Sequence, residues 1–136
     1  MVIVRAYLAS LVAFLAVDAV WLLLVAAPLF AARLGDWLRP APDLSAAAAF
    51  YLIYAAGLTG LAVLPTRRQA SLAAAAAKGA LLGLTAYATF DLTALAILQR
   101  YTLDLALADI AWGTAASSVA ALAGVFAAGQ ERETAS

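Results

Sequence analysis

The sequence predicts an all-α polytopic membrane protein, a four-transmembrane-helix bundle whose successive helices run antiparallel, up and down. Hydrophobic residues make up 67% of its 136 residues, charged residues make up 12%, and mean hydropathy is +0.98. An ordinary soluble domain has roughly 45–50% apolar and about 25% charged residues. A chain this short has too little interior to bury so much apolar surface in water. Four segments also supply the roughly 20 apolar residues that a spanning helix needs.

The four expected spans form a single domain, residues 1–128, followed by a short polar tail at 129–136. Proline lacks the N–H that continues a helix, so we expect the first span to end near Pro28 and the second to stop at Pro65. The polar link 29–43 is typical of an interfacial loop, with or without a short helix lying on the bilayer. In order, the spans cover about 2–27, 44–64, 70–98 and 103–128.

Basic residues predict how the bundle lies in its membrane. Four spans place both termini on one side, and short cytoplasmic loops carry the excess of Lys and Arg. The side with the termini holds five basic residues and the opposite side three, so we expect both termini in the cytoplasm. The five are Arg5, Arg67, Arg68, Lys78 and Arg132, and the three are Arg33, Arg39 and Arg100.

Missing residue types exclude several kinds of site. The chain has no Cys, which excludes disulfide exchange, thiolate catalysis and thiolate metal sites. It has no His, which removes the usual haem and zinc ligands and the Ser-His hydrolases. Its 8 Lys and Arg balance 8 Asp and Glu, so it lacks the basic surface of nucleic-acid-binding proteins. We therefore expect no cofactor, no bound metal and no nucleic-acid partner.

Three aspartates lie inside the expected spans: Asp18, Asp91 and Asp109. Each costs about 2.5–3.5 kcal/mol on membrane-insertion scales, so we expect them to face the bundle interior, paired or protonated. Their positions along spans of alternating direction place all three in the membrane half distal to the termini. Interhelical hydrogen bonds in membranes average about 0.6 kcal/mol and offset this cost poorly. The three aspartates therefore indicate one functional cluster in a polar and aromatic cavity.

Two of these aspartates belong to a repeated pattern. The first and fourth spans each contain Asp-x-x-Trp, with Asp18 before Trp21 and Asp109 before Trp112. This spacing places each indole one helical turn from the carboxylate of its own span.

Tyrosines complete the expected site. Tyr87 lies one turn before Asp91, and we expect it to be the nearest hydrogen-bond donor to that carboxyl. The second span brings Tyr51 and Tyr54 to a similar depth. Carboxylates beside aromatic rings suit a cationic or amphipathic ligand. The candidate ligand-binding residues are Asp18, Trp21, Tyr54, Tyr87, Asp91, Asp109 and Trp112.

Small residues predict close packing of the last two spans. Gly79 and Gly83 form a GxxxG pattern in the third span, and the fourth span repeats small residues every four positions. Such rows let helix backbones approach one another within a bilayer, so we expect a compact bundle. The rows of the fourth span are Gly113, Ser117 and Ala121, and Ala116, Ala120 and Gly124.

Five separated segments, in order between about Arg5 and Gly124, resemble a known family. They are Asp18–Leu22, Phe50–Gly57, Leu64–Pro65, Gly83–Thr93 and Asp109–Gly113. The chain is similar to the uncharacterised bacterial membrane proteins grouped as domain of unknown function 2177. The resemblance implies a four-span protein of the bacterial inner membrane with no established activity. The family pattern has Asn three residues after the third-span aspartate, where this chain has Ala94.

Three kinds of function fit these residues. The first is binding or transport of a small cationic or amphipathic ligand, with a protonated aspartate permitting proton coupling. The second is a non-catalytic accessory or scaffold subunit of a membrane complex, in which the aspartates only hold helices together. Besides lipid, the partners would then be copies of the chain or other membrane proteins.

The third kind of function is intramembrane catalysis. Asp91 and Asp109 could share a proton and activate water, as an aspartic dyad does. The chain lacks the Asn-containing motifs of the lipoprotein signal peptidases and the Gly-x-Gly-Asp motif of presenilin-type proteases. The residues therefore favour the first two functions over an enzyme. Three aspartates would also allow an oxygen-ligand site for Mg²⁺, Mn²⁺ or Ca²⁺.

Overall fold

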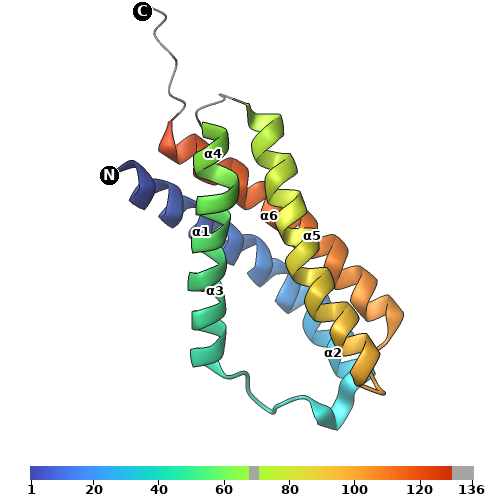
Figure 1. Ribbon diagram of the computed structural model, residues 1–136. Coiled ribbons are helices and arrows are strands. Elements are labelled where there is room, and N and C mark those ends of the chain that lie inside the picture. The colour runs from blue at the N-terminus through green and yellow to red at the C-terminus, as the bar shows by residue number, and fades with distance from the viewer. Residues whose placement is uncertain (68–70, 130–136) are drawn as a thin grey trace, which may run out of the picture.

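The computed structural model describes residues 1–67 and 71–129, and all regular structure within them is helical (Figure 1). Within these described ranges, four helical stretches are long and apolar enough to cross a membrane. They are Val2–Trp37, Leu44–Arg67, Leu72–Ile97 and Leu103–Ala128. The all-α class and the four spans are thereby confirmed, whereas the direction of each span across a bilayer stays a prediction. The expected tail after Gly129 lies outside the described residues.

The first span is longer than expected. It consists of α1 (Val2–Trp21), the π-helical turn η1 (Leu22–Ala26), α2 (Ala27–Leu34) and the 3₁₀ turn η2 (Gly35–Trp37). The helix continues past Pro28, near which we expected the first span to end, and part of the expected interfacial link is helical. Where the span leaves the membrane stays a prediction. In η1 the N–H of Ala27 bonds the carbonyl of Leu22, five residues earlier. A π-helical turn shifts the hydrogen-bond register by one residue, which eases the clash between a proline ring and the carbonyl four residues earlier.

The second span repeats this arrangement. It consists of α3 (Leu44–Leu58), the π-helical turn η3 (Thr59–Val63) and α4 (Leu64–Arg67), so the helix passes through Pro65 where we expected it to stop. The side chain of Asp43 caps α3 by accepting from the N–H groups of Ser45 and Ala46. The Ser45 hydroxyl also donates to Asp43, and this bond is the main reason that the pKa of Asp43 is lowered; the N–H bonds lower it further.

The third and fourth spans, α5 (Leu72–Ile97) and α6 (Leu103–Ala128), pack closely along their length. An added Cβ on Gly79 would lie 2.6 Å from the Ser117 carbonyl oxygen, and one on Gly83 would lie 2.4 Å from the Gly113 carbonyl oxygen. Each distance is too short for a real side chain. Glycine is therefore required at both positions, as the small-residue pattern predicted.

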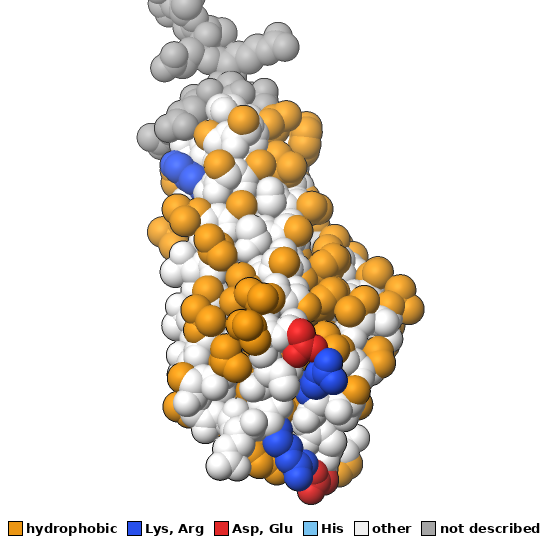
Figure 2. All heavy atoms as spheres, turned by 90° about the vertical axis from the view of Figure 1, so that its right-hand side faces the viewer, with side chains coloured by type: hydrophobic (Ala, Val, Ile, Leu, Met, Phe, Trp, Pro, Cys, Tyr) orange, Lys and Arg blue, Asp and Glu red, His pale blue; other side chains and the backbone are white. Residues whose placement is uncertain are grey.

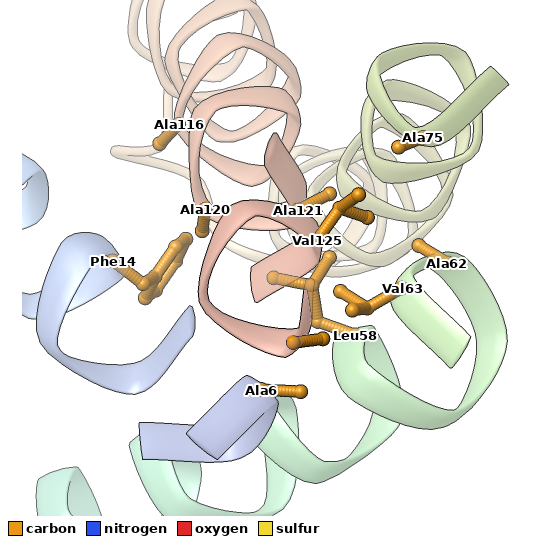
Figure 3. Packing of buried hydrophobic residues seen from close by; sticks show 11 residues of the cluster. Ala6, Phe14, Leu58, Ala62, Val63, Ala75, Ala116, Ala120, Ala121 and Val125 are labelled. Atoms are coloured by element: carbon orange, nitrogen blue, oxygen red, sulfur yellow. The ribbon is translucent and has the colours of Figure 1, made fainter. Parts of the chain in front are cut away.

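α6 is the central helix of the bundle. It contacts α1 on one side, α5 on another, and the η3 and α4 region as well. Its small residues are buried, and the Phe14 ring of α1 lies beside Ala120 in Figure 3. Larger side chains from the second span, Leu58 and Val63, fill the same cluster beside Val125.

The outer surface is apolar. Large aliphatic residues are strongly exposed on every span, including Leu23 at 76%, Ile53 at 72% and Ile97 at 72%. Figure 2 shows hydrophobic side chains spread over most of one face of the molecule. Such a surface suits contact with lipid chains rather than with water.

Candidate functional site

Four side chains from α1 and α6 form a reciprocal cluster, which we call the carboxylate–tryptophan cluster: Asp18, Trp21, Asp109 and Trp112. The indole Nε1 of Trp21 donates to Asp109 Oδ1 over 3.2 Å. The indole Nε1 of Trp112 donates to Asp18 Oδ1 over 3.3 Å. The two rings stack, with centroids 5.0 Å apart and planes inclined by 6°. The indole of each Asp-x-x-Trp pattern therefore donates to the carboxylate of the other pattern.

The two helices position these groups through ordinary helical spacing. Residues three apart lie on one face, so each pattern presents its carboxylate and its indole together. α1 and α6 pack side by side, which brings the two faces into contact. The sequence predicted an indole one turn from its own carboxylate, whereas each indole bonds the carboxylate of the other helix. Only the packing of α1 on α6 decides this exchange.

Asp18 also binds a third helix. The hydroxyl of Tyr51 in α3 donates to Asp18 Oδ2, so both oxygens of this carboxyl are engaged. Asp18 is 5% exposed. Tyr51 therefore belongs to the site, although it is not one of the predicted ligand-binding residues. Tyr51 lies one helical turn before Tyr54, so both side chains are on one face of α3, and this spacing could have predicted that Tyr51 belongs to the site.

Asp91 lies apart from this cluster and has a different partner. It is fully buried, and its Oδ1 accepts from the hydroxyl of Tyr101 in the link between α5 and α6. The expected donor, Tyr87, is not the partner of Asp91. Tyr87 instead packs its ring against Gly113, where an added Cβ would lie 2.2 Å from ring atoms. Tyr101 was not among the predicted site residues, because its place beside Asp91 depends on the tight turn of the link.

The remaining candidate, Tyr54, lies deeper in the apolar cluster. Its hydroxyl shares a hydrogen bond of 2.6 Å with the Ser117 hydroxyl. Its ring meets the Tyr87 ring edge to face, with centroids 6.4 Å apart. Tyr54 and Tyr87 therefore border the site through packing, and neither hydroxyl donates to a carboxylate in the described part of the chain.

The three intramembrane carboxylates have no basic partner in the part of the chain that the structure describes. In residues 1–67 and 71–129 no Lys or Arg forms an ion pair with Asp18, Asp91 or Asp109. The same ranges contain no group of three or more acidic residues close enough to hold a metal ion. Asp91 and Asp109 each accept from a different aromatic residue, so the arrangement does not present the directly bonded pair of an aspartic dyad.

Two surface hollows lie elsewhere. One, of about 490 Å³, follows the outer face of α5, and the other, of about 700 Å³, lies where Met1–Ile3 meets Leu64–Arg67. Neither is lined by a residue of the carboxylate–tryptophan cluster. A cavity at that cluster thus stays a prediction.

Comparison with known proteins identifies the family. Residues 3–126 match the family described as "Predicted membrane protein (DUF2177)". The chain belongs to this family. The match covers most of the 136 residues and confirms the resemblance that the five sequence segments indicated. The family description names a membrane protein of unknown function and states no activity.

Neither the curated proteins nor the solved structures include a match to this chain. The cluster geometry therefore provides the functional argument.

Proposed function

We propose that this member of family DUF2177 binds a small cationic or amphipathic ligand at the carboxylate–tryptophan cluster. The observation that carries the proposal is the pairing of two carboxylates, neither of them matched by a basic side chain in the described residues, with a stacked pair of indoles. Carboxylate oxygens and indole faces are the two groups that attract organic cations most strongly.

Asp109 is the group best placed to meet a ligand. Its Oδ1 accepts from Trp21, and its Oδ2 has no hydrogen-bond partner in the described part of the chain. The side chains of Asp109, Trp21 and Trp112 are only partly buried, whereas Asp18 is closed by Tyr51 and Trp112. A cation arriving from the lipid side would therefore contact Asp109 and an indole face first, while Asp18 holds the stack in place.

Binding of tetraphenylphosphonium, a lipophilic cation, tests the proposal. The protein is placed in lipid nanodiscs with Trp37 changed to Phe, so that Trp21 and Trp112 alone report by fluorescence. We expect saturable quenching by the cation and no saturable quenching by tetraphenylborate, an anion of the same shape. Asp109→Asn should weaken binding at least tenfold, because opposite unit charges about 8 Å apart attract by about 2 kcal/mol at the effective dielectric constant of a protein surface.

The matched control is Asp104→Asn, because Asp104 is an exposed carboxylate of the same helix paired with Arg33. This variant should bind the cation as the parent does. Equal quenching by cation and anion, or equal binding by the Asp109 and Asp104 variants, would overturn the proposal.

A second function is favoured by a different observation. The hydrogen bonds of Asp18 and Asp109 join α1, α3 and α6, and the outer face of every span is apolar. A non-catalytic accessory subunit of a membrane complex would need only this internal bracing and an outer face for partners. It predicts that aspartate variants lose assembly and stability while no ligand saturates the cluster.

We also propose that the protein lies in the bacterial inner membrane with both termini in the cytoplasm. The excess of basic residues on the side of the termini supports this orientation. Copies of the chain or other membrane proteins remain its expected partners.

A further inference from the structure

Asp91 combines two properties that rarely occur together. It is 0% exposed, and its Oδ2 is a buried oxygen with no hydrogen-bond partner among the described residues. One donor, the Tyr101 hydroxyl, serves the whole carboxyl group. An ionised carboxylate inside a membrane needs a cation or several donors, because burying an uncompensated charge is very costly. A neutral carboxylic acid is the form that this environment tolerates best.

The charged and titratable groups around Asp91 point the same way. Tyr101 faces it from the link, and Asp109 of α6 is close enough for the two carboxyl groups to interact electrostatically. The nearby basic side chains are engaged elsewhere, since Arg33 pairs with Asp104 and Arg100 pairs with Asp36. Two neighbouring carboxyl groups with no cation between them do not both ionise readily.

α2 packs against Tyr101, the residue that bonds this carboxyl, and we call α2 the cover. Tyr101 closes Asp91, and the Phe30 ring of α2 meets the Tyr101 ring edge to face at 6.2 Å. Leu34 of α2 joins Tyr101 and Leu105 in a separate small apolar cluster at this end of the bundle. Figure 1 shows α2 beside the ends of α5 and α6 that meet at their link.

Exposed ion pairs join α2 and the following turn η2 to α6 and the α5–α6 link. Arg33 of α2 bonds Asp104 over 2.6 Å, Asp36 pairs with Arg100, and the Arg100 guanidinium lies 5.1 Å from the Trp37 ring. Figure 2 shows acidic and basic side chains in contact at the lower part of the molecule. Exposed ion pairs are worth only about 0.2–1 kcal/mol each.

On its other side the cover joins α1 through η1. Four of the five residues of this π-helical turn are exposed, and Ala26 alone is buried. π-helical turns are places where helices bend. We propose that Asp91 is a proton-binding carboxyl group, sealed from water by α2 and reached when α2 swings about η1. This inference does not depend on a ligand at the carboxylate–tryptophan cluster.

Dicyclohexylcarbodiimide is the probe, because it adds to protonated carboxyl groups in apolar surroundings. The carboxylic O–H adds across a C=N bond, so the protein gains one whole carbodiimide molecule and nothing leaves. The full chain in nanodiscs is treated at pH 7, and peptide mass spectrometry locates the adduct. We expect the label on Asp91 and its loss in Asp91→Asn. Because the adduct is located in the parent protein itself, the result stands even if that variant folds poorly.

The seal is tested by changing the ion pairs. Arg33→Ala with Arg100→Ala should speed labelling of Asp91 about fivefold, the loss expected for two exposed pairs. Arg39→Ala is the matched control, because Arg39 pairs with Asp43 over 3.6 Å and does not hold α2. It should leave the labelling rate unchanged.

A cross-link tests the opposite change. The chain has no cysteine, so a disulfide between Arg33→Cys and Asp104→Cys would be its single thiol pair. Oxidation should slow labelling of Asp91, and reduction should restore it. An unlabelled Asp91, a label on Asp18 or Asp109 instead, or one labelling rate in all variants would overturn the inference.

Discussion

The indole rings of Trp21 and Trp112 lie face to face, 5.0 Å apart, and each donates its N–H to a carboxylate on the helix of the other. The helices α1 and α6 are far apart in the sequence and adjacent in the fold. Two hydrogen bonds and one ring contact join them at the same depth in the bundle. Inside a membrane an unpaired indole N–H has no water to bond. The exchange of partners satisfies both donors with one contact surface.

This relationship predicts energetic coupling. Trp21→Phe and Trp112→Phe each remove one N–H and keep an aromatic ring. Each should lower the free energy of unfolding by about 1 kcal/mol, since one interhelical bond averages about 0.6 kcal/mol and ring stacking adds to it. Unfolding in SDS, followed by circular dichroism, measures the change. The loss of unfolding free energy in the double variant should differ from the sum of the two single losses by at least about 0.5 kcal/mol, as expected for residues in contact.

The control for this cycle is Trp37→Phe, because Trp37 is exposed and lies outside the stack. Its effect should add to that of either variant. Strict additivity of Trp21→Phe and Trp112→Phe would show that the two residues are not coupled.

The Tyr101 hydroxyl should matter more than its size suggests. Tyr101→Phe removes the donor to Asp91 and leaves both carboxyl oxygens unpartnered in a buried place. We expect a loss of about 1–3 kcal/mol in unfolding free energy, the usual cost of a buried unsatisfied polar group. Tyr7→Phe is the control, since the Tyr7 hydroxyl is exposed and bonds a backbone oxygen over 3.3 Å. Equal losses in both variants would contradict the assigned role.

Gly113 is expected to tolerate no side chain while the Tyr87 ring packs against it. Its added Cβ would lie 2.2 Å from the Tyr87 ring, and overpacking a filled core costs about 1–3 kcal/mol. Gly113→Ala should therefore lower the SDS concentration at which the protein unfolds. Gly57→Ala is matched to it in chemistry but meets nothing within 4 Å, so it should be neutral or stabilising. Tyr87→Leu should partly rescue Gly113→Ala, and no rescue would place the clash elsewhere.

Asp43 predicts a dependence of stability on pH. Hydrogen bonds from the Ser45 hydroxyl and the Ala46 N–H lower its pKa below the ordinary value of 3.8. A lowered pKa stabilises the folded state above the unfolded value, and this contribution is lost as pH falls through the folded value. Thermal unfolding between pH 6 and 3 should therefore show a smaller decline for Asp43→Asn, which caps a helix without titrating. An unchanged pH profile would contradict the cap.

Particular elements mark how far the sequence reaches. The four spans were predictable because a run of apolar residues long enough for a bilayer has few other uses. Gly79 and Gly83 predicted the close approach of α5 and α6, because small residues on one helix face let a neighbouring backbone come close whatever the rest of the fold is. The helices continue past Pro28 and Pro65, where the sequence predicted that the first two spans end. A π-helical turn ahead of each proline depends on packing that the local sequence does not encode.

The sequence predicted the carboxylates of the site but not their hydrogen-bond partners. Residue types and depth alone identified Asp18, Asp91 and Asp109 as costly groups that must face inward, because the membrane penalises a carboxylate wherever it lies along a span. Their partners depend on how one helix face meets another, which is a property of the packed bundle. The tertiary structure therefore decided that Trp21 bonds Asp109, that Trp112 bonds Asp18, and that Asp91 lies beneath Tyr101.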